Sequence, residues 1–144
     1  MKKLLFLLVL TILSFATRAQ VVNVKNTYAC TVQVTFFAAN TACQRYTTSS
    51  FPVTVPPGAV VPVNLGAAAT WTGIVPPPGS IYAAQICVVC SSGTLFCAGL
   101  TGCPPCFNPH LGPITVPTSC CPTTMLLQAD WICTAAPMQL NIHP

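Results

Sequence analysis

Residues that could carry acid–base or nucleophilic chemistry are scarce in this chain, whereas cysteines are abundant. Its 144 residues include a single acidic residue, Asp130, and two histidines, His110 and His143, against ten cysteines. Glycoside hydrolysis needs a pair of carboxyl groups, which one carboxylate cannot supply. A Ser–His–Asp arrangement would have to combine Asp130 with one of the histidines, and no serine has the flanking sequence of a nucleophile elbow. We therefore expect no catalytic residues and no enzymatic activity.

Each of these three residues also has a simpler structural interpretation. His110 lies in a stretch rich in proline and glycine and is expected in a surface loop, and His143 is penultimate and expected to be mobile. Asp130 is expected to make a turn hydrogen bond or a lone ion pair, with Lys25 and Arg45 as the available cations.

The cysteines are the main chemical resource of the sequence. They are Cys30, Cys43, Cys87, Cys90, Cys97, Cys103, Cys106, Cys120, Cys121 and Cys133. An even number of cysteines in an exported chain predicts a complete set of disulfides, here five. A disulfide between the adjacent residues Cys120 and Cys121 is not expected, because a disulfide needs suitably directed Cβ vectors. The two cysteines should therefore bond to different partners. Cys30 and Cys43 stand apart from the other eight, and we expect them to pair with each other.

Two alternatives compete with disulfides for some of these cysteines. Cys87-x-x-Cys90 and Cys103-x-x-Cys106 are spaced much like the ligands of a four-cysteine zinc site. An export signal and six further cysteines favour disulfides, so no bound metal or other cofactor is expected. The Cys103–Cys106 spacing also matches redox sites, but those sites begin a helix, and the prolines that follow Cys106 oppose one.

The first 19 residues match a secretory signal peptide. Two lysines form the basic start, residues 4–15 are apolar, and Ala19 ends a run of small residues suited to cleavage, with a cut after Ala16 as the alternative. A twelve-residue helix spans only ~18 Å of a ~30 Å hydrocarbon core, which argues against a retained anchor. We expect residues 20–144 to be secreted, as an extracellular, cell-surface or periplasmic protein.

Loss of the signal leaves very little charge. The removed segment holds three of the five Lys and Arg residues, so the formal net charge falls from +4 to +1, and Lys25, Arg45 and Asp130 remain. Nucleic acids and anionic membranes are bound by clusters of cations, which two residues cannot form, so neither is an expected partner. Near-zero net charge also removes the repulsion between copies, and strand edges without Lys or Glu favour pairing.

Alternation of apolar and polar residues predicts short β-strands throughout the mature chain. They are expected at residues 22–24, 32–36, 51–55, 59–65, 80–90, 94–97, 114–116, 125–128 and 138–142. Fifteen prolines exclude a long helix, which favours an all-β fold: an antiparallel β-sandwich or barrel-like domain, stapled by disulfides. Pro62 predicts an edge strand because it lacks a ladder donor, and Pro56-Pro57-Gly58 predicts a turn.

The distribution of cysteines divides the chain into two halves. We expect a single domain at residues 20–144, with eight cysteines in the half that begins at about residue 80 and long irregular connections around residues 99–124. Two small domains joined by residues 76–79 are the alternative.

Aromatic residues leave room for a binding function. Trp71, flanked by threonines, and Tyr46 could form a stacking platform for sugar rings, whereas Trp131 is expected in the core. The charge pattern favours a non-catalytic secreted component that is structural or self-assembling. The alternatives are a carbohydrate- or protein-binding, adhesin-like module and a small disulfide-braced inhibitor or effector that presents residues 99–118 as an exposed loop.

Several features together resemble small secreted bacterial cysteine-rich proteins of unknown function. They are residues 2–5 and 19–20 of the signal, the valine-rich stretch 22–24, the early cysteines Cys30 and Cys43, and the turn at 56–58. The resemblance covers the first half of the chain, implies an exported location and carries no site residues.

Overall fold

The structure is a computed structural model that describes residues 21–39, 45–77, 80–100, 110–121, 126–132, 135 and 137–144, without the side chains of Arg45, Tyr46, Ile81 and Leu100. The predicted signal peptide lies outside the described residues. Four of the cysteines also lie outside them, namely Cys43, Cys103, Cys106 and Cys133.

Strands make up most of the described structure. They are β1 (Val21–Asn26), β2 (Val32–Ala39), β3 (Arg45–Thr48), β4 (Val53–Val55), β5 (Val60–Asn64), β6 (Ile81–Val89), β7 (Leu95–Leu100), β8 (His110–Thr115), β9 (Leu126–Ile132) and β10 (Met138–His143), with one 3-10 turn, η1 (Ala68–Thr70). No helix in the described part of the chain has the length and apolar character needed to cross a membrane.

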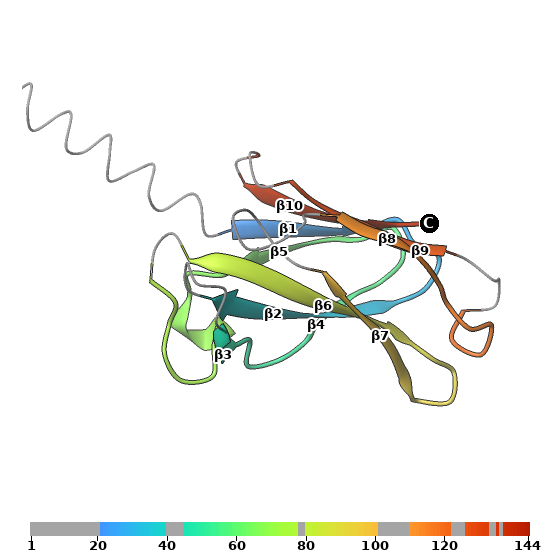
Figure 1. Cartoon of the computed structure of the whole chain (residues 1–144), viewed down its shortest axis with the longest axis horizontal. Helices are drawn as coiled ribbons and strands as arrows, with labels where there is room; N and C mark the ends of the chain where they lie inside the picture. Colours follow the sequence, from blue (N-terminus) through green and yellow to red (C-terminus); the bar gives the residue numbers. More distant parts are fainter. Residues whose placement is uncertain are drawn as a thin grey trace, which may run out of the picture.

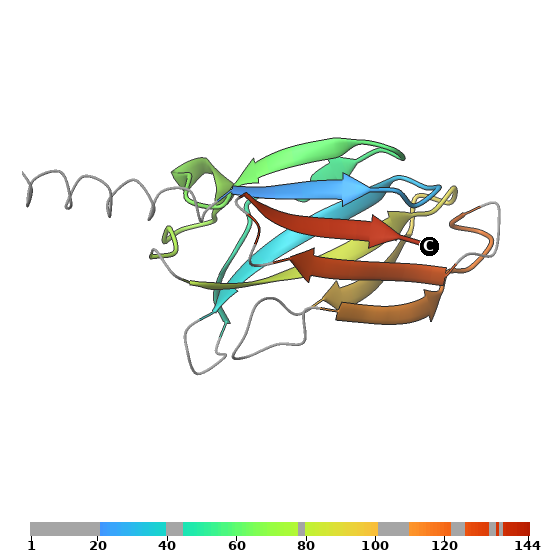
Figure 2. The same cartoon turned by 90° about the horizontal axis from the view of Figure 1, so that it is seen from above.

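The strands form two sheets that pack face to face. Sheet A has the order β5-β1-β10-β9-β8, and sheet B has the order β3-β2-β6-β7, with β4 also paired to β2. Figure 1 shows the sheets as two layers, and Figure 2 shows the strands of sheet A side by side. Strands from before and after residue 76 contribute to both sheets. The predicted all-β sandwich is confirmed.

The alternation of the sequence decides which side chains enter the core. In β1, Val22 and Val24 are fully buried while Asn23 and Lys25 face solvent, and β10 repeats this pattern in parallel register. Between the sheets, Phe36 of β2 meets Trp131 of β9 edge to face, with ring centroids 6.0 Å apart. The expectation that Trp131 fills the core is confirmed.

Two predictions from proline and glycine are confirmed near β5. Pro62 lies in β5, which is an edge strand of sheet A. The turn at residues 56–58 joins β4 to β5, and Gly58 adopts a φ of 74°, a left-handed conformation that glycine takes without steric cost.

Two regions differ from the expected pattern. β3 was not predicted at all, and it pairs with β2. Within the expected irregular connection of residues 99–124, residues 110–115 form β8, which pairs with β9 and is longer than the strand expected at residues 114–116. The register of β8 shifts between Leu111 and Ile114, and this bulge accommodates the Gly112-Pro113 pair that suggested a loop.

Candidate functional site

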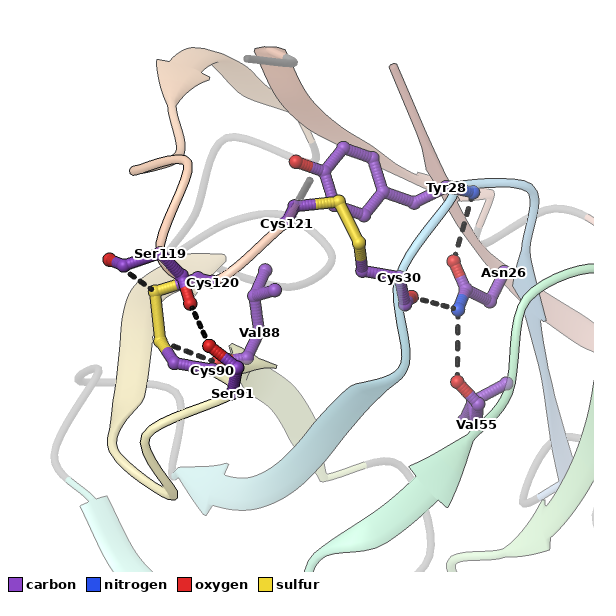
Figure 3. Close-up of a disulfide and its surroundings, with 10 residues drawn as sticks. All are labelled: Asn26, Tyr28, Cys30, Val55, Val88, Cys90, Ser91, Ser119, Cys120 and Cys121. Atoms are coloured by element: carbon purple, nitrogen blue, oxygen red, sulfur yellow. Dashed lines mark hydrogen bonds between the residues drawn. A yellow bond between two sulfur atoms is a disulfide. The ribbon is translucent and has the colours of Figure 1, made fainter. Parts of the chain in front are cut away.

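Two adjacent cysteines tie sheet B to the segment that follows β8. Cys30 precedes β2 and Cys90 follows β6, so both lie at one end of sheet B because these strands are antiparallel. Cys121 is bonded to Cys30 and Cys120 to Cys90, in different directions (Figure 3). We call these four residues the disulfide junction. The prediction that Cys120 and Cys121 have different partners is confirmed.

The predicted Cys30–Cys43 bond is wrong, because Cys30 is bonded to Cys121, 91 residues away. The error arises from using separation along the chain as a guide to partners. Folding brings the β1–β2 connection beside the segment after β8, and Cys121 is fully buried there.

The third described disulfide joins two strands of the same sheet. Cys87 of β6 and Cys97 of β7 are direct cross-strand partners and are bonded to each other. Together with the Cys90–Cys120 bond, this disulfide removes both thiolates that the zinc alternative assigned to Cys87 and Cys90. Every cysteine in the described part of the chain is in a disulfide.

A buried carboxamide connects the two sheets beside the disulfide junction. Asn26, at the end of β1, donates from Nδ2 to the carbonyl oxygens of Cys30 at 3.0 Å and Val55 at 2.9 Å. Its Oδ1 accepts the backbone N–H of Tyr28 at 3.0 Å (Figure 3). Because Val55 ends β4, this fully buried side chain links sheet A to sheet B and leaves none of its own hydrogen-bonding groups unpaired. Burial raises the pKa of the neighbouring Tyr28 phenol.

Three ionisable side chains from three strands meet on the outer face of sheet A. His110 of β8 donates from Nδ1 to Asp130 Oδ1 at 2.6 Å, and His143 of β10 donates from Nε2 to Asp130 Oδ2 at 2.9 Å. The side chains of His110, Asp130 and His143 remain 48%, 44% and 32% exposed. We call this arrangement the Asp130 clamp.

The Asp130 clamp corrects three expectations. His110 is on the surface as predicted, but it begins a strand and does not lie in a loop. His143 is the last residue of β10 and is hydrogen-bonded to Asp130, so its side chain is held in the sheet and does not have the mobility expected from the sequence. Asp130 has two histidine partners in place of a turn or a lone ion pair, because β9 lies between β8 and β10 in the sheet.

Hydrogen bonding favours the ionised form of Asp130. The bond from His110, supported by the bond from His143, holds the pKa of this carboxyl below its ordinary value, and partial burial opposes the shift. Each histidine contributes one ring nitrogen to the same carboxylate. The clamp therefore links three neighbouring strands on the solvent side of sheet A.

A second group of polar side chains lies beside the clamp. Asn23, Lys25, Gln139 and Asn141 project from β1 and β10 and, with Val60 of β5, line a depression of about 240 Å³. Asn23 is the cross-strand partner of Gln139, and Lys25 of Asn141. We call the four polar residues the amide face. Its three carboxamides are half-buried, and Lys25 is exposed.

The strands at the edges of the sheets differ in their protection. Both edges of sheet A contain proline, Pro62 in β5 and Pro113 in β8. On sheet B, β7 has the sequence LFCAGL, without proline or charge, and its first residue, Leu95, is 49% exposed. Among the described edges, β7 is thus a six-residue strand without the sequence features that discourage pairing.

The predicted aromatic platform is wrong for Trp71. This residue is 4% exposed, stacks on Tyr82 at 5.9 Å between ring centroids, and donates from Nε1 to the carbonyl oxygen of Leu65 at 2.6 Å. The backbone of Trp71 forms an isolated β-bridge with Ser49, and its ring is part of the hydrophobic core. The ring is therefore not available to stack on a sugar. The side chain of Tyr46 lies outside the described structure.

Sequence reasoning missed the amide face and the Asp130 clamp. The alternation in β1 and β10 was visible, and it places Asn23 and Asn141 on the outer side of their strands. What could not be read was the parallel pairing of β1 with β10, the two ends of the described chain, which brings these residues together.

Comparisons with known proteins identify no relative: no family model, curated protein or solved structure matches this chain.

Proposed function

We propose that this protein is a non-catalytic structural component that acts outside the cytoplasm and assembles through the edge of β7. The observation that carries the proposal is the contrast between β7 and the proline-containing edges of sheet A. An edge strand presents unpaired N–H and C=O groups, and proteins usually blunt it with charge, proline or bulges. β7 has no charged residue and no proline.

The Cys87–Cys97 disulfide supports this role. It holds β7 against β6 in fixed register, so the edge is already ordered before a partner arrives. A preorganised strand loses less conformational entropy on pairing than a mobile one. Two copies of β7 could therefore extend sheet B across a dimer contact by ordinary main-chain hydrogen bonds.

The disulfides also suit the proposed location. Disulfides persist in oxidising compartments and are rare in the cytosol, and three lie within the described residues. The predicted signal peptide agrees with this placement. The Asp130 clamp, in which two histidines share one carboxylate, supports a stabilising role for the few ionisable residues.

The test is to place charge on the edge of β7. Leu95 is exposed, and a Cβ at Gly99 meets no atom within 4 Å, so Leu95→Lys/Gly99→Lys should fold normally. We expect the oxidised wild-type protein to associate as its concentration rises, measured by light scattering after size exclusion and by electron microscopy. The variant should remain monomeric, because like charges on facing strands repel.

A matched control places the same charge on an interior strand. Leu126→Lys/Ile132→Lys adds two lysines to β9, where the native residues are 47% and 38% exposed; this strand lies between β8 and β10 and so is not an edge. This variant should associate like the wild type. A wild-type protein that stays monomeric at every concentration, or association that survives the β7 charges, contradicts the proposal.

A binding module is the second candidate, and the amide face favours it. Without Trp71 as a platform, such a site depends on carboxamides and Lys25 rather than on aromatic stacking. The inhibitor alternative loses part of its expected loop, because residues 110–115 form β8.

A further inference from the structure

The amide face has hydrogen-bonding capacity that the fold does not use. Within the described residues, the side chains of Asn23, Gln139 and Asn141 form no hydrogen bond, and Lys25 has no carboxylate partner. The one described carboxylate side chain, that of Asp130, already accepts bonds from two histidines. These four side chains nevertheless line a common depression, with Val60 as an apolar wall.

We infer that this depression binds a single acidic sugar unit at the end of a glycan. A carboxamide donates through its NH₂ group and accepts through its oxygen, which matches a hydroxyl group that also does both. Three carboxamides can thus engage the hydroxyls of one ring, while the Lys25 ammonium pairs with the sugar carboxylate by a charge-assisted hydrogen bond. The exposed side chain of Val60 can contact the C–H face of the ring.

The size of the depression limits the ligand to about one ring. Its volume of about 240 Å³ lies below the ~300–1,000 Å³ typical of sites for drug-sized molecules. A single sugar with its carboxylate is a suitable occupant, and the rest of a glycan would extend into solvent over the flat sheet.

Asp130 limits the number of acidic groups that a bound glycan can carry near this depression. Lys25 and Asp130 both flank Asn141 in register, so they lie two strand spacings apart, roughly 10 Å. The pKa of Asp130 is lowered, which keeps it negative, and it would repel a second acidic unit that reached across β10. The face therefore suits a glycan with one terminal acid better than a chain that is charged at every ring.

The test compares two probes that differ only in the acid. A glucuronate-terminated disaccharide and the matching glucose-terminated disaccharide are titrated into the oxidised protein and followed by amide chemical shifts in two-dimensional NMR. We expect the acidic probe to bind about tenfold more tightly, as one charge-assisted hydrogen bond provides, and added salt to reduce this preference. The shifted resonances should belong to β1, β5 and β10.

Two variants separate the contributions. Lys25→Gln should abolish the preference for the acid while weak binding of both probes remains, and Gln139→Ala/Asn141→Ala should weaken both probes. The control is Gln85→Ala, at an exposed carboxamide on the outer side of β6 in sheet B, and it should change neither affinity. Equal affinity for the two probes, no binding of either, or unchanged binding by Gln139→Ala/Asn141→Ala overturns the inference. None of these results bears on association through β7, which lies in the other sheet.

Discussion

The outer faces of the two sheets place different chemistry on the same framework. On sheet A, one row of cross-strand neighbours consists of Lys25, Asn141, Asp130 and His110. The comparable row on sheet B consists of Thr54, Gln33, Cys87 and Cys97, so a disulfide stands where sheet A has ionisable groups. Among the described side chains, Lys25, Asp130 and the two histidines thus all lie on the outer face of sheet A.

The edges of the sheets repeat this division. Both edges of sheet A contain proline, whereas β7, one of the edges of sheet B, contains none and is joined to its neighbour by a disulfide. The two proposals follow this division: glycan binding is proposed for the polar outer face of sheet A, and association for the β7 edge of sheet B. The disulfide junction joins one end of sheet B to the segment that follows β8 of sheet A.

The largest expected effect is the loss of stability when the Cys30–Cys121 disulfide is removed, compared with removal of the Cys87–Cys97 disulfide within sheet B. Cys30→Ala/Cys121→Ala removes a disulfide that spans 91 residues, and Cys87→Ala/Cys97→Ala removes one that spans 10. Loop-closure entropy gives about 4.6 kcal/mol for the first and about 2.7 kcal/mol for the second. Urea unfolding of the two variants measures the free energies, and equal losses would show that the disulfide junction has no special role.

A medium effect is expected at the hydrogen-bonded link between the sheets. Asn26→Ala should lower the free energy of unfolding by about 2–3 kcal/mol, because it leaves the buried carbonyls of Cys30 and Val55 and the N–H of Tyr28 without this partner.

The control for Asn26 is Asn64, which makes a similar turn at an exposed edge. Its Oδ1 accepts the N–H of Gly66 at 2.9 Å, and water can replace this bond. Asn64→Ala should therefore cost less than about 1 kcal/mol in the same unfolding experiment. Similar losses at both positions would contradict a linking role for Asn26.

The smallest effect concerns pH and sheet A alone. Because folding lowers the pKa of Asp130, the unfolded chain takes up a proton first on acidification. The stabilisation from this carboxylate is complete above about pH 5 and is lost as the pH falls through the lowered native pKa. Exposure of the Asp130 clamp limits the effect to about 1 kcal/mol or less.

The test compares the free energy of unfolding of the wild type with that of Asp130→Asn across the pH range. The free energy of unfolding of the wild type should exceed that of the variant near neutral pH, and the gap should close in acid. A gap that stays constant or widens as the pH falls would show that the carboxylate does not stabilise the native state.

Local patterns predicted the parts of the fold that local physics controls. Alternation located β1, β2 and β10, Pro62 identified an edge strand, and adjacency showed that Cys120 and Cys121 must diverge. Each of these inferences needs only the geometry of a strand, a proline or a peptide unit.

Long-range pairing decided what the sequence could not show. The partner of Cys30 depends on the path of the whole chain, and the meeting of His143 with Asp130 depends on β10 entering the sheet beside β9. Trp71 was misjudged because its polar neighbours suggested the surface, whereas the carbonyl of Leu65 satisfies its indole N–H inside the core. The first two contacts join residues far apart in the chain, whereas the Trp71 bond is local and depends on how residues 65–71 fold back into the core.

The most direct test of the account is the disulfide map of the oxidised protein. Proteolysis without reduction, followed by mass spectrometry, should yield one species in which the peptide carrying Cys120 and Cys121 is joined both to the peptide with Cys30 and to the peptide with Cys90. A peptide in which Cys30 is bonded to Cys43, or free thiols at Cys120 and Cys121, would contradict the proposal that adjacent cysteines hold the two sheets together.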